Sequence, residues 1–83
     1  MVRLETTFSA REELSPDFAA EISNCVAKYQ AAVTLKYGEK RLRLESLIGI
    51  LSLELRKGAR VAVIAEGSDE LAAAEEIRNI LLG

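Results

Sequence analysis

The stretch from Ala59 to Gly67, ARVAVIAEG, constrains the fold of this chain more than any other. It is dense in Val and Ile, the β-branched residues that strands favour, and it has little polar interruption. Such a run is typical of a strand at the centre of a sheet. We therefore predict that this stretch is a central strand and that the other strands of the chain assemble beside it.

Three further strands are predicted from side chains that alternate in character. Residues 2–9, VRLETTFS, place Val, Leu, Thr and Phe on one side and polar residues on the other, the period of two that strands show. Residues 33–37 and 41–44 alternate in the same way. Gly38-Glu39 between them favours a tight turn, so the two segments are predicted to form a β-hairpin.

Helices are predicted for residues 15–30, about 46–55 and 68–83. A residue that N-caps prefer stands at the start of each: Ser15, Ser46, and Ser68 or Asp69. Pro16 suits the first position of the first helix, and the cations and glycine of RKG, residues 56–58, are expected to end the second.

The order β-α-β-β-α-β-α predicts an α+β fold, with a four-stranded antiparallel sheet and three helices on one face. At 83 residues the chain is expected to form one domain, residues 1–83. Cys25, on the apolar stripe of the first helix, is expected to be a small core residue rather than a reactive thiol. The expected core comprises Phe18, Ile22, Val26, Leu35, Leu44, Ile50, Leu53, Val61, Val63, Ile77 and Leu81.

Composition excludes several classes of function. The chain has no histidine, which removes the commonest general base and metal ligand and rules out a Cys/His zinc site. With one cysteine it cannot form an internal disulfide, and we expect a cytoplasmic location. The chain contains no run of about 18 apolar residues, the length that a membrane-spanning helix needs. We expect neither a metal nor another cofactor.

The charge balance argues against a dedicated nucleic-acid binder. Thirteen acidic and 11 basic residues give a net charge of −2, whereas nucleic-acid affinity depends on clustered positive charge. Candidates for a basic patch are Arg41, Arg43, Arg56, Lys57 and Arg60. No aromatic residues interleave them for base stacking, so a solvated face is the simpler interpretation.

The short second helix carries more apolar surface than one buried face requires. If Ile50 and Leu53 point into the core, then Leu47, Ile48 and Leu51 point sideways or outward. Gly49 costs a helix about 1 kcal/mol against alanine, which indicates a close approach at this position. An exposed aliphatic cluster marks a partner site on a small soluble domain. The alternative is a helix that is well buried beneath its neighbours.

The chain resembles the HPr family, the small histidine-containing phosphocarriers of the bacterial sugar phosphotransferase system. The resemblance is strongest in LESLIGILSL and KGARVAVIAEGSDE, within residues 44–70, and runs from Val2 to about Leu82. The family pattern is a serine, two apolar residues, glycine and xxSL, then KGA, a strand and AxGxDE. The resemblance implies an open-faced β-sandwich with three helices.

The first half departs from the family at its phosphorylation motif, GLHARP. Here the corresponding residues are ELSPDF, so Ser15 stands in place of the phosphoryl-accepting histidine and Asp17 in place of an arginine. A serine phosphoester holds its phosphoryl group too firmly for a relay, and Asp17 would repel an incoming phosphate. We therefore interpret Ser15 as a helix cap and expect an HPr-like protein, not an enzyme, without phosphocarrier activity.

The family resemblance gives Ser46 a second interpretation. In many Gram-positive members the matching serine is phosphorylated by a serine kinase/phosphorylase, and the product is a corepressor for a catabolite-control transcription factor. One branch, the Crh proteins, lacks the histidine and keeps this serine. The resemblance implies these proteins as partners of Leu47, Ile48, Gly49 and Leu51. The alternative is that Ser46 only caps its helix, and Glu45 would repel a phosphate there.

Three hypotheses about function follow. The first is a regulatory, protein-binding module of the phosphotransferase system, monomeric or weakly dimeric, with no direct contact to nucleic acid or membrane. The second is a phosphocarrier with an unorthodox acceptor. The third is a structural domain that associates with itself through the short helix.

Overall fold

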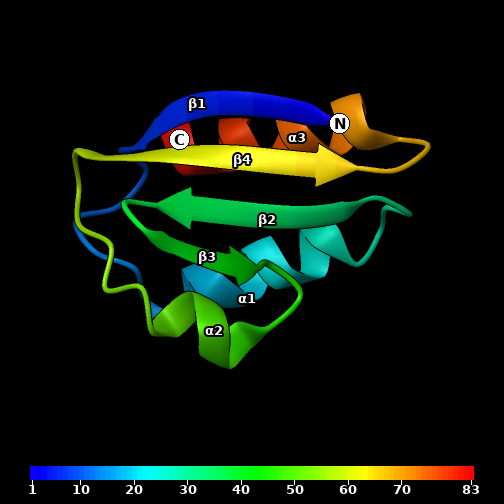
Figure 1. Ribbon diagram of the computed structural model, residues 1–83. Helices are drawn as coiled ribbons and strands as arrows, with labels where there is room; N and C mark the ends of the chain where they lie inside the picture. The colour runs from blue at the N-terminus through cyan, green and yellow to red at the C-terminus, as the bar shows by residue number, and fades with distance from the viewer.

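The computed structural model describes residues 1–83, and its central strand is the Val- and Ile-rich stretch, β4 (Ala59–Glu66). β4 pairs with β1 (Val2–Phe8) along one edge and with β2 (Ala32–Tyr37) along the other. β3 (Lys40–Arg43) pairs with β2, so the order is β1-β4-β2-β3 and every pair is antiparallel. Figure 1 shows β1 and β3 at the two edges of the sheet. The predicted central position of residues 59–66 is confirmed.

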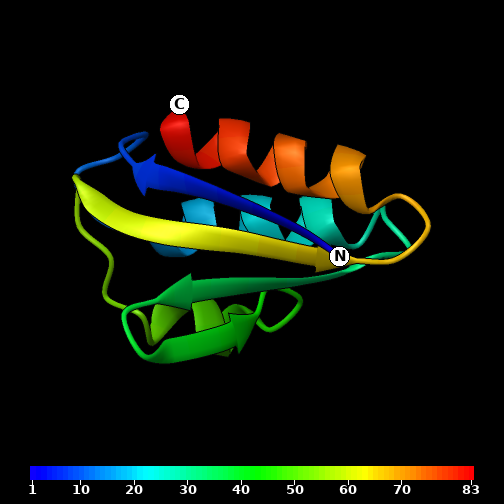
Figure 2. The same ribbon diagram turned by 45° about the horizontal axis from the view of Figure 1, so that its top comes forward.

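The helices lie on one side of the sheet and leave the other side open. α1 (Pro16–Val26) and α3 (Glu70–Leu82) lie behind the strands in Figure 1, and α3 packs on β1 and β4. The short α2 (Leu47–Leu51) packs against α1 and at the β3 edge of the sheet, and Figure 2 shows it beside β3. The predicted element order and α+β class are confirmed. No helix is long and apolar enough to cross a membrane.

The core lies between the helices and the facing side of the sheet. Alternate residues of β2 and β4 point into it, such as Val33 and Leu35, Val61 and Val63. All eleven residues predicted to form the core are buried, none with more than 5% of its surface exposed. Cys25 is buried as predicted, and Phe8 and Leu55 join the core as further large residues. Burial of this apolar surface is the main stabilising term of such a domain.

The second helix is shorter than predicted. It ends at Leu51 rather than near residue 55, because the hydroxyl of Ser52 donates to the carbonyl of Gly49 at 2.6 Å and Glu54 has φ of 52°, outside the helical region. Leu53 and Leu55 are buried from the non-helical segment that follows. Residues 56–58 therefore do not end a helix.

The first helix also ends early, and the third begins differently from the prediction. α1 stops at Val26, and after a turn the backbone N–H groups of Gln30 and Ala31 donate to the carboxylate of Asp69 at 2.9 and 2.8 Å. Asp69 stands at the N-cap position of α3, but its side chain makes no hydrogen bond to that helix. It ties the α1–β2 loop to α3 instead. Ile80 of α3 is only partly buried, whereas Ala74 is fully buried.

Thr6 carries the one buried side-chain oxygen without a hydrogen-bond partner. It pairs with Val61 across the β1–β4 ladder and therefore shares the core-facing side of the sheet. A buried hydroxyl without a partner costs about 1–3 kcal/mol. Thr6→Val, which keeps the shape and removes the hydroxyl, should raise the free energy of unfolding by about 1 kcal/mol in denaturant titrations. Thr7→Val is the control, and an equal change in both variants would contradict the assignment.

Candidate functional site

Ser15 begins α1 and uses its hydroxyl there. Its backbone is extended, with φ −95° and ψ 161°, and its Oγ accepts a hydrogen bond from the N–H of Phe18 at 3.2 Å. Pro16 follows in the first turn, and the side chain of Asp17 is exposed there. Both the predicted cap and the predicted place of Pro16 are confirmed. Ser15 is only partly accessible, because hydrogen bonds to other segments fix the loop before it.

The loop that leads to Ser15, residues 9–14, is held by partners far away in sequence. The N–H groups of Ser9 and Ala10 both donate to the carbonyl of Leu81, at 2.9 and 3.0 Å. The N–H of Leu14 donates to Leu55, and that of Lys57 donates back to Glu12. This ladder around residues 12–14 and 55–57 fixes the start of α1 against the segment after α2.

The electrostatic surroundings of Ser15 are acidic. Glu12, Glu13 and Asp17 are all exposed near the start of α1, and only Glu12 has a cation close by, the Lys57 Nζ at 3.6 Å. The guanidinium of Arg11 lies over the ring of Phe18, 5.2 Å from its centre. No histidine exists anywhere in the chain to accept a phosphoryl group. Of the three carboxylates, Asp17 lies in the first turn of α1 itself, where an incoming phosphate would meet its negative charge.

Ser46 caps α2 in the same way as Ser15 caps α1, but it is exposed. Its Oγ accepts a hydrogen bond from the N–H of Gly49 at 3.2 Å. A side chain at Gly49 would place its Cβ 3.2 Å from that same Oγ. The close approach expected at Gly49 therefore comes from the cap of its own helix. Glu45 lies before the serine, and its carboxylate pairs with Arg43 at 3.0 Å.

The apolar patch predicted on the second helix consists of two exposed residues rather than three. Ile48 is 83% exposed and Leu47 is 41% exposed. Leu51 is only partly buried and packs against the core, so of the two predicted directions, sideways and outward, it takes the sideways one. Its remaining surface contributes to a hollow of about 320 Å³, whose other walls include Leu14, Glu13 and Arg56. The hollow therefore lies between α2 and the loop that leads to Ser15.

Two of the five predicted basic-patch residues lie near this hollow, and three lie elsewhere. Arg56 forms an isolated backbone bridge with Glu13, and Lys57 pairs with Glu12. Arg41, Arg43 and Arg60 belong to strands. The five residues therefore do not form one patch.

A polar network that the sequence did not indicate joins α1 to α3. The carboxylate of Glu76 accepts hydrogen bonds from the thiol of Cys25 at 2.9 Å, from the ammonium of Lys28 at 3.2 Å, and from the hydroxyl of Tyr29. These donors, with Cys25 first and then Tyr29, lower the pKa of Glu76 to about 2. Burial and the bond to Glu76 raise the pKa of Cys25 to about 12, and the bond to Glu76 raises the pKa of Tyr29 to about 12. The thiol is therefore held protonated and unreactive.

Comparison with known protein families identifies the family of this chain. The model of the family described as "PTS HPr component phosphorylation site" matches residues 2–82. The chain belongs to the HPr family. Its members are phosphocarriers of the phosphotransferase system, and they interact with other proteins. In this HPr-family chain, Ser15 and Ser46 are the N-cap residues of α1 and α2, and these two helices pack together.

Solved structures of HPr-family proteins have the same fold. The HPr of Bacillus anthracis has a TM-score of 0.91 at 24% identity, over 96% of this chain and 95% of that one. HPr-C-His of Thermoanaerobacter tengcongensis gives 0.90 at 23% identity, over 98% and 91%. The catabolite-repression protein Crh of Bacillus subtilis gives 0.78 at 28% identity, over 98% and 86%. The open-faced arrangement of strands and helices is therefore that of this family.

The network around Glu76 predicts an acid-sensitive link between α1 and α3. Because the pKa of Glu76 falls from 4.5 to about 2 on folding, its stabilisation is present above pH 4.5 and is lost as the pH falls toward 2. Glu76→Gln should therefore show a weaker decrease of melting temperature over this pH range than the unmodified protein. Glu75→Gln, at an exposed neighbouring position without a hydrogen bond, is the control. Equal pH dependence in all three proteins would contradict the role of Glu76.

Proposed function

We propose that this HPr-family chain is a regulatory, protein-binding module that does not carry phosphoryl groups on a histidine. The observation that carries the proposal is the absence of any histidine, together with Ser15 at the start of α1 bonded to the N–H of Phe18. A serine phosphoester at this position would not pass its phosphoryl group on readily. Glu12, Glu13 and Asp17 add negative charge where a phosphate would enter. The protein acts by binding, not by catalysis, in the cytoplasm.

Ser46 is the proposed regulated residue. Its exposure favours it over Ser15, which is half-buried behind a loop held by Leu55 and Leu81. The Oγ of Ser46 accepts one hydrogen bond in its own helix, and the hydroxyl remains open to solvent. A phosphate would lie beside Glu45, so its effect on binding would be smaller than beside a neutral residue.

The proposed binding surface is α2, with Leu47 and Ile48 as apolar anchors and Gly49 and Leu51 between them and the core. A few desolvated apolar residues carry most of the binding energy in such interfaces. The partners we propose by family likeness are a serine kinase/phosphorylase and a catabolite-control transcription factor. Self-association is the second candidate, because Ile48 is 83% exposed and the Crh structure is described as a swapped dimer.

The absence of phosphocarrier activity is tested by incubation with phosphoenolpyruvate and the family's upstream kinase. We expect no acid-labile phosphoryl group on this protein. A histidine-containing HPr in the same reaction is the positive control. Transfer to this chain would establish the alternative, a phosphocarrier with an unorthodox acceptor.

Phosphorylation of Ser46 is tested with the family's serine kinase and mass spectrometry. We expect one phosphate, mapped to Ser46 and absent from Ser46→Ala. Because Ser52 lies on the same surface and is also exposed, Ser52→Ala is the matched control and should still be phosphorylated. No incorporation, or equal incorporation in Ser46→Ala, would leave Ser46 as a helix cap only.

Ile48→Ser should separate binding from folding. The side chain is mostly exposed, so we expect the free energy of unfolding to change by no more than about 0.5 kcal/mol. Binding to the serine kinase/phosphorylase, measured by titration calorimetry, should be lost because the main anchor is gone. Leu71→Ser, at a position 54% exposed on α3, should bind normally. A large loss of stability in Ile48→Ser would show that the residue serves the fold.

A further inference from the structure

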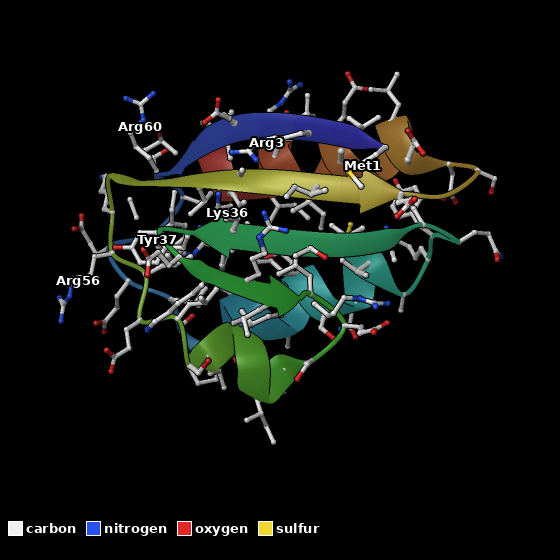
Figure 3. All side chains as sticks on the ribbon, in the orientation of Figure 1. Met1, Arg3, Lys36, Tyr37, Arg56 and Arg60 are labelled. Carbon is white, nitrogen blue, oxygen red and sulfur yellow. The ribbon has the colours of Figure 1, made fainter.

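The open face of the sheet, opposite α1 and α3, carries five cations: Arg3, Lys36, Arg41, Arg43 and Arg60. Their position follows from the pairing registers. Thr34 and Lys36 alternate with the buried Val33 and Leu35, and residues directly opposite in a ladder share a face. The registers run from Arg3 through Ile64 and Thr34 to Arg43, and from Glu5 through Ala62 and Lys36 to Arg41. Figure 3 shows Arg3 and Lys36 on this side.

Two of these cations oppose each other without compensation. Lys36 lies directly opposite Arg41 in the β2–β3 ladder, and like charges at such positions destabilise a sheet. Neither has a carboxylate within ion-pair distance, nor have Arg3 and Arg60; of the five, only Arg43 is paired. The sheet therefore holds an arrangement of charge that its own stability does not favour. Such a cost is characteristic of surfaces kept for binding.

The same face has two hollows that side chains of a partner could occupy. A hollow of about 180 Å³ is bordered by Arg3, Lys36 and Arg60, with Glu5 as its only acid. A second hollow, of about 210 Å³, is bordered by Arg41, Arg43 and Ile64, with Glu66 as its only acid. Between the two hollows run Ala62 and Ile64 of β4. Ala62 is only 4% exposed and Ile64 is partly exposed, so the apolar surface at the middle of the face is narrow and centred on Ile64. An apolar centre with a charged rim is the usual anatomy of a protein interface.

The distribution of charge over the whole chain favours a protein rather than a nucleic acid as the occupant. The strands carry six basic and two acidic residues, whereas α1 and α3 together carry five acidic residues and one basic. The chain has a net charge of −2, and its excess of positive charge is confined to the sheet, which a short acidic segment can match but a long polyanion would extend beyond. The open face also offers no aromatic side chain for base stacking.

We propose that the open face of the sheet, formed by Arg3, Lys36, Arg41, Arg43 and Arg60 around Ala62 and Ile64, docks an acidic amphipathic helix of a protein partner. The apolar stripe of that helix packs on the apolar surface centred on Ile64, and its flanking carboxylates enter the two hollows. Helix on sheet is the packing that this face lacks and the opposite face already has. The surface is separate from α2, so the fold presents two binding faces.

The test uses the intact protein and a fluorescent synthetic helix with a leucine stripe flanked by glutamates. We expect binding that weakens with salt and that falls about tenfold in Lys36→Gln/Arg41→Gln, because rim charges are removed. Lys57→Gln, a cation away from this face, should bind normally. The melting temperature of the double variant should not fall, since a repulsion is relieved. Amide NMR shifts should map to β1, β2, β3 and β4.

Several outcomes would overturn the proposal. They are no binding, equal binding by the double variant, and equal binding of a matched helix with lysines in place of glutamates. Tighter binding of a DNA duplex would assign the face to nucleic acid instead. Sedimentation that shows self-association lost in the double variant would assign it to a second copy. Ile48→Ser should bind the acidic helix normally; loss of binding in this variant would place the helix on α2.

Discussion

The pairing of β4 on both of its edges is the constraint on which the rest of the structure depends. Because Val61 and Val63 point to one side of the sheet, both long helices have to cover that side. The pairing also places β4, the last strand, beside β1, the first. α2 is then left at the β3 edge, and the other side of the sheet is left open. The two surfaces with the strongest claim to partners, α2 and the open face, are the places that this helix layer does not reach.

The two serines that cap α1 and α2 have the same cap geometry but differ in accessibility. Each accepts a hydrogen bond from a backbone N–H three residues later, at 3.2 Å. Ser15 stands behind a loop held at both ends, whereas Ser46 stands on a short helix at the edge of the fold. A modifying enzyme needs access more than it needs a free hydroxyl, because a cap worth about 1 kcal/mol can be given up. Position in the fold therefore distinguishes the two residues.

Local patterns in the sequence were sufficient for the strands, for both serine caps and for the core. They failed where a residue acts over a long distance. Glu76 looks like a surface carboxylate, and nothing near it predicts that it holds Cys25 and Tyr29, about 50 residues away. Asp69 looks like a helix cap but bonds to the loop at Gln30. The cations of the open face could be gathered into one group only after the strand register was known, because register is set by the whole sheet.

The hydrogen bonds from Ser9 and Ala10 to the carbonyl of Leu81 have a consequence for motion in the molecule. The last turn of a helix frays readily, and in most proteins this affects nothing else. Here the last turn of α3 is the anchor for the loop that leads to Ser15 and α1. When that turn opens, the loop loses its bonds at Ser9 and Ala10, while those at Glu12 and Leu14 still hold its other end. Fraying at the C-terminal end of α3 is therefore expected to loosen the first part of the loop that leads to Ser15.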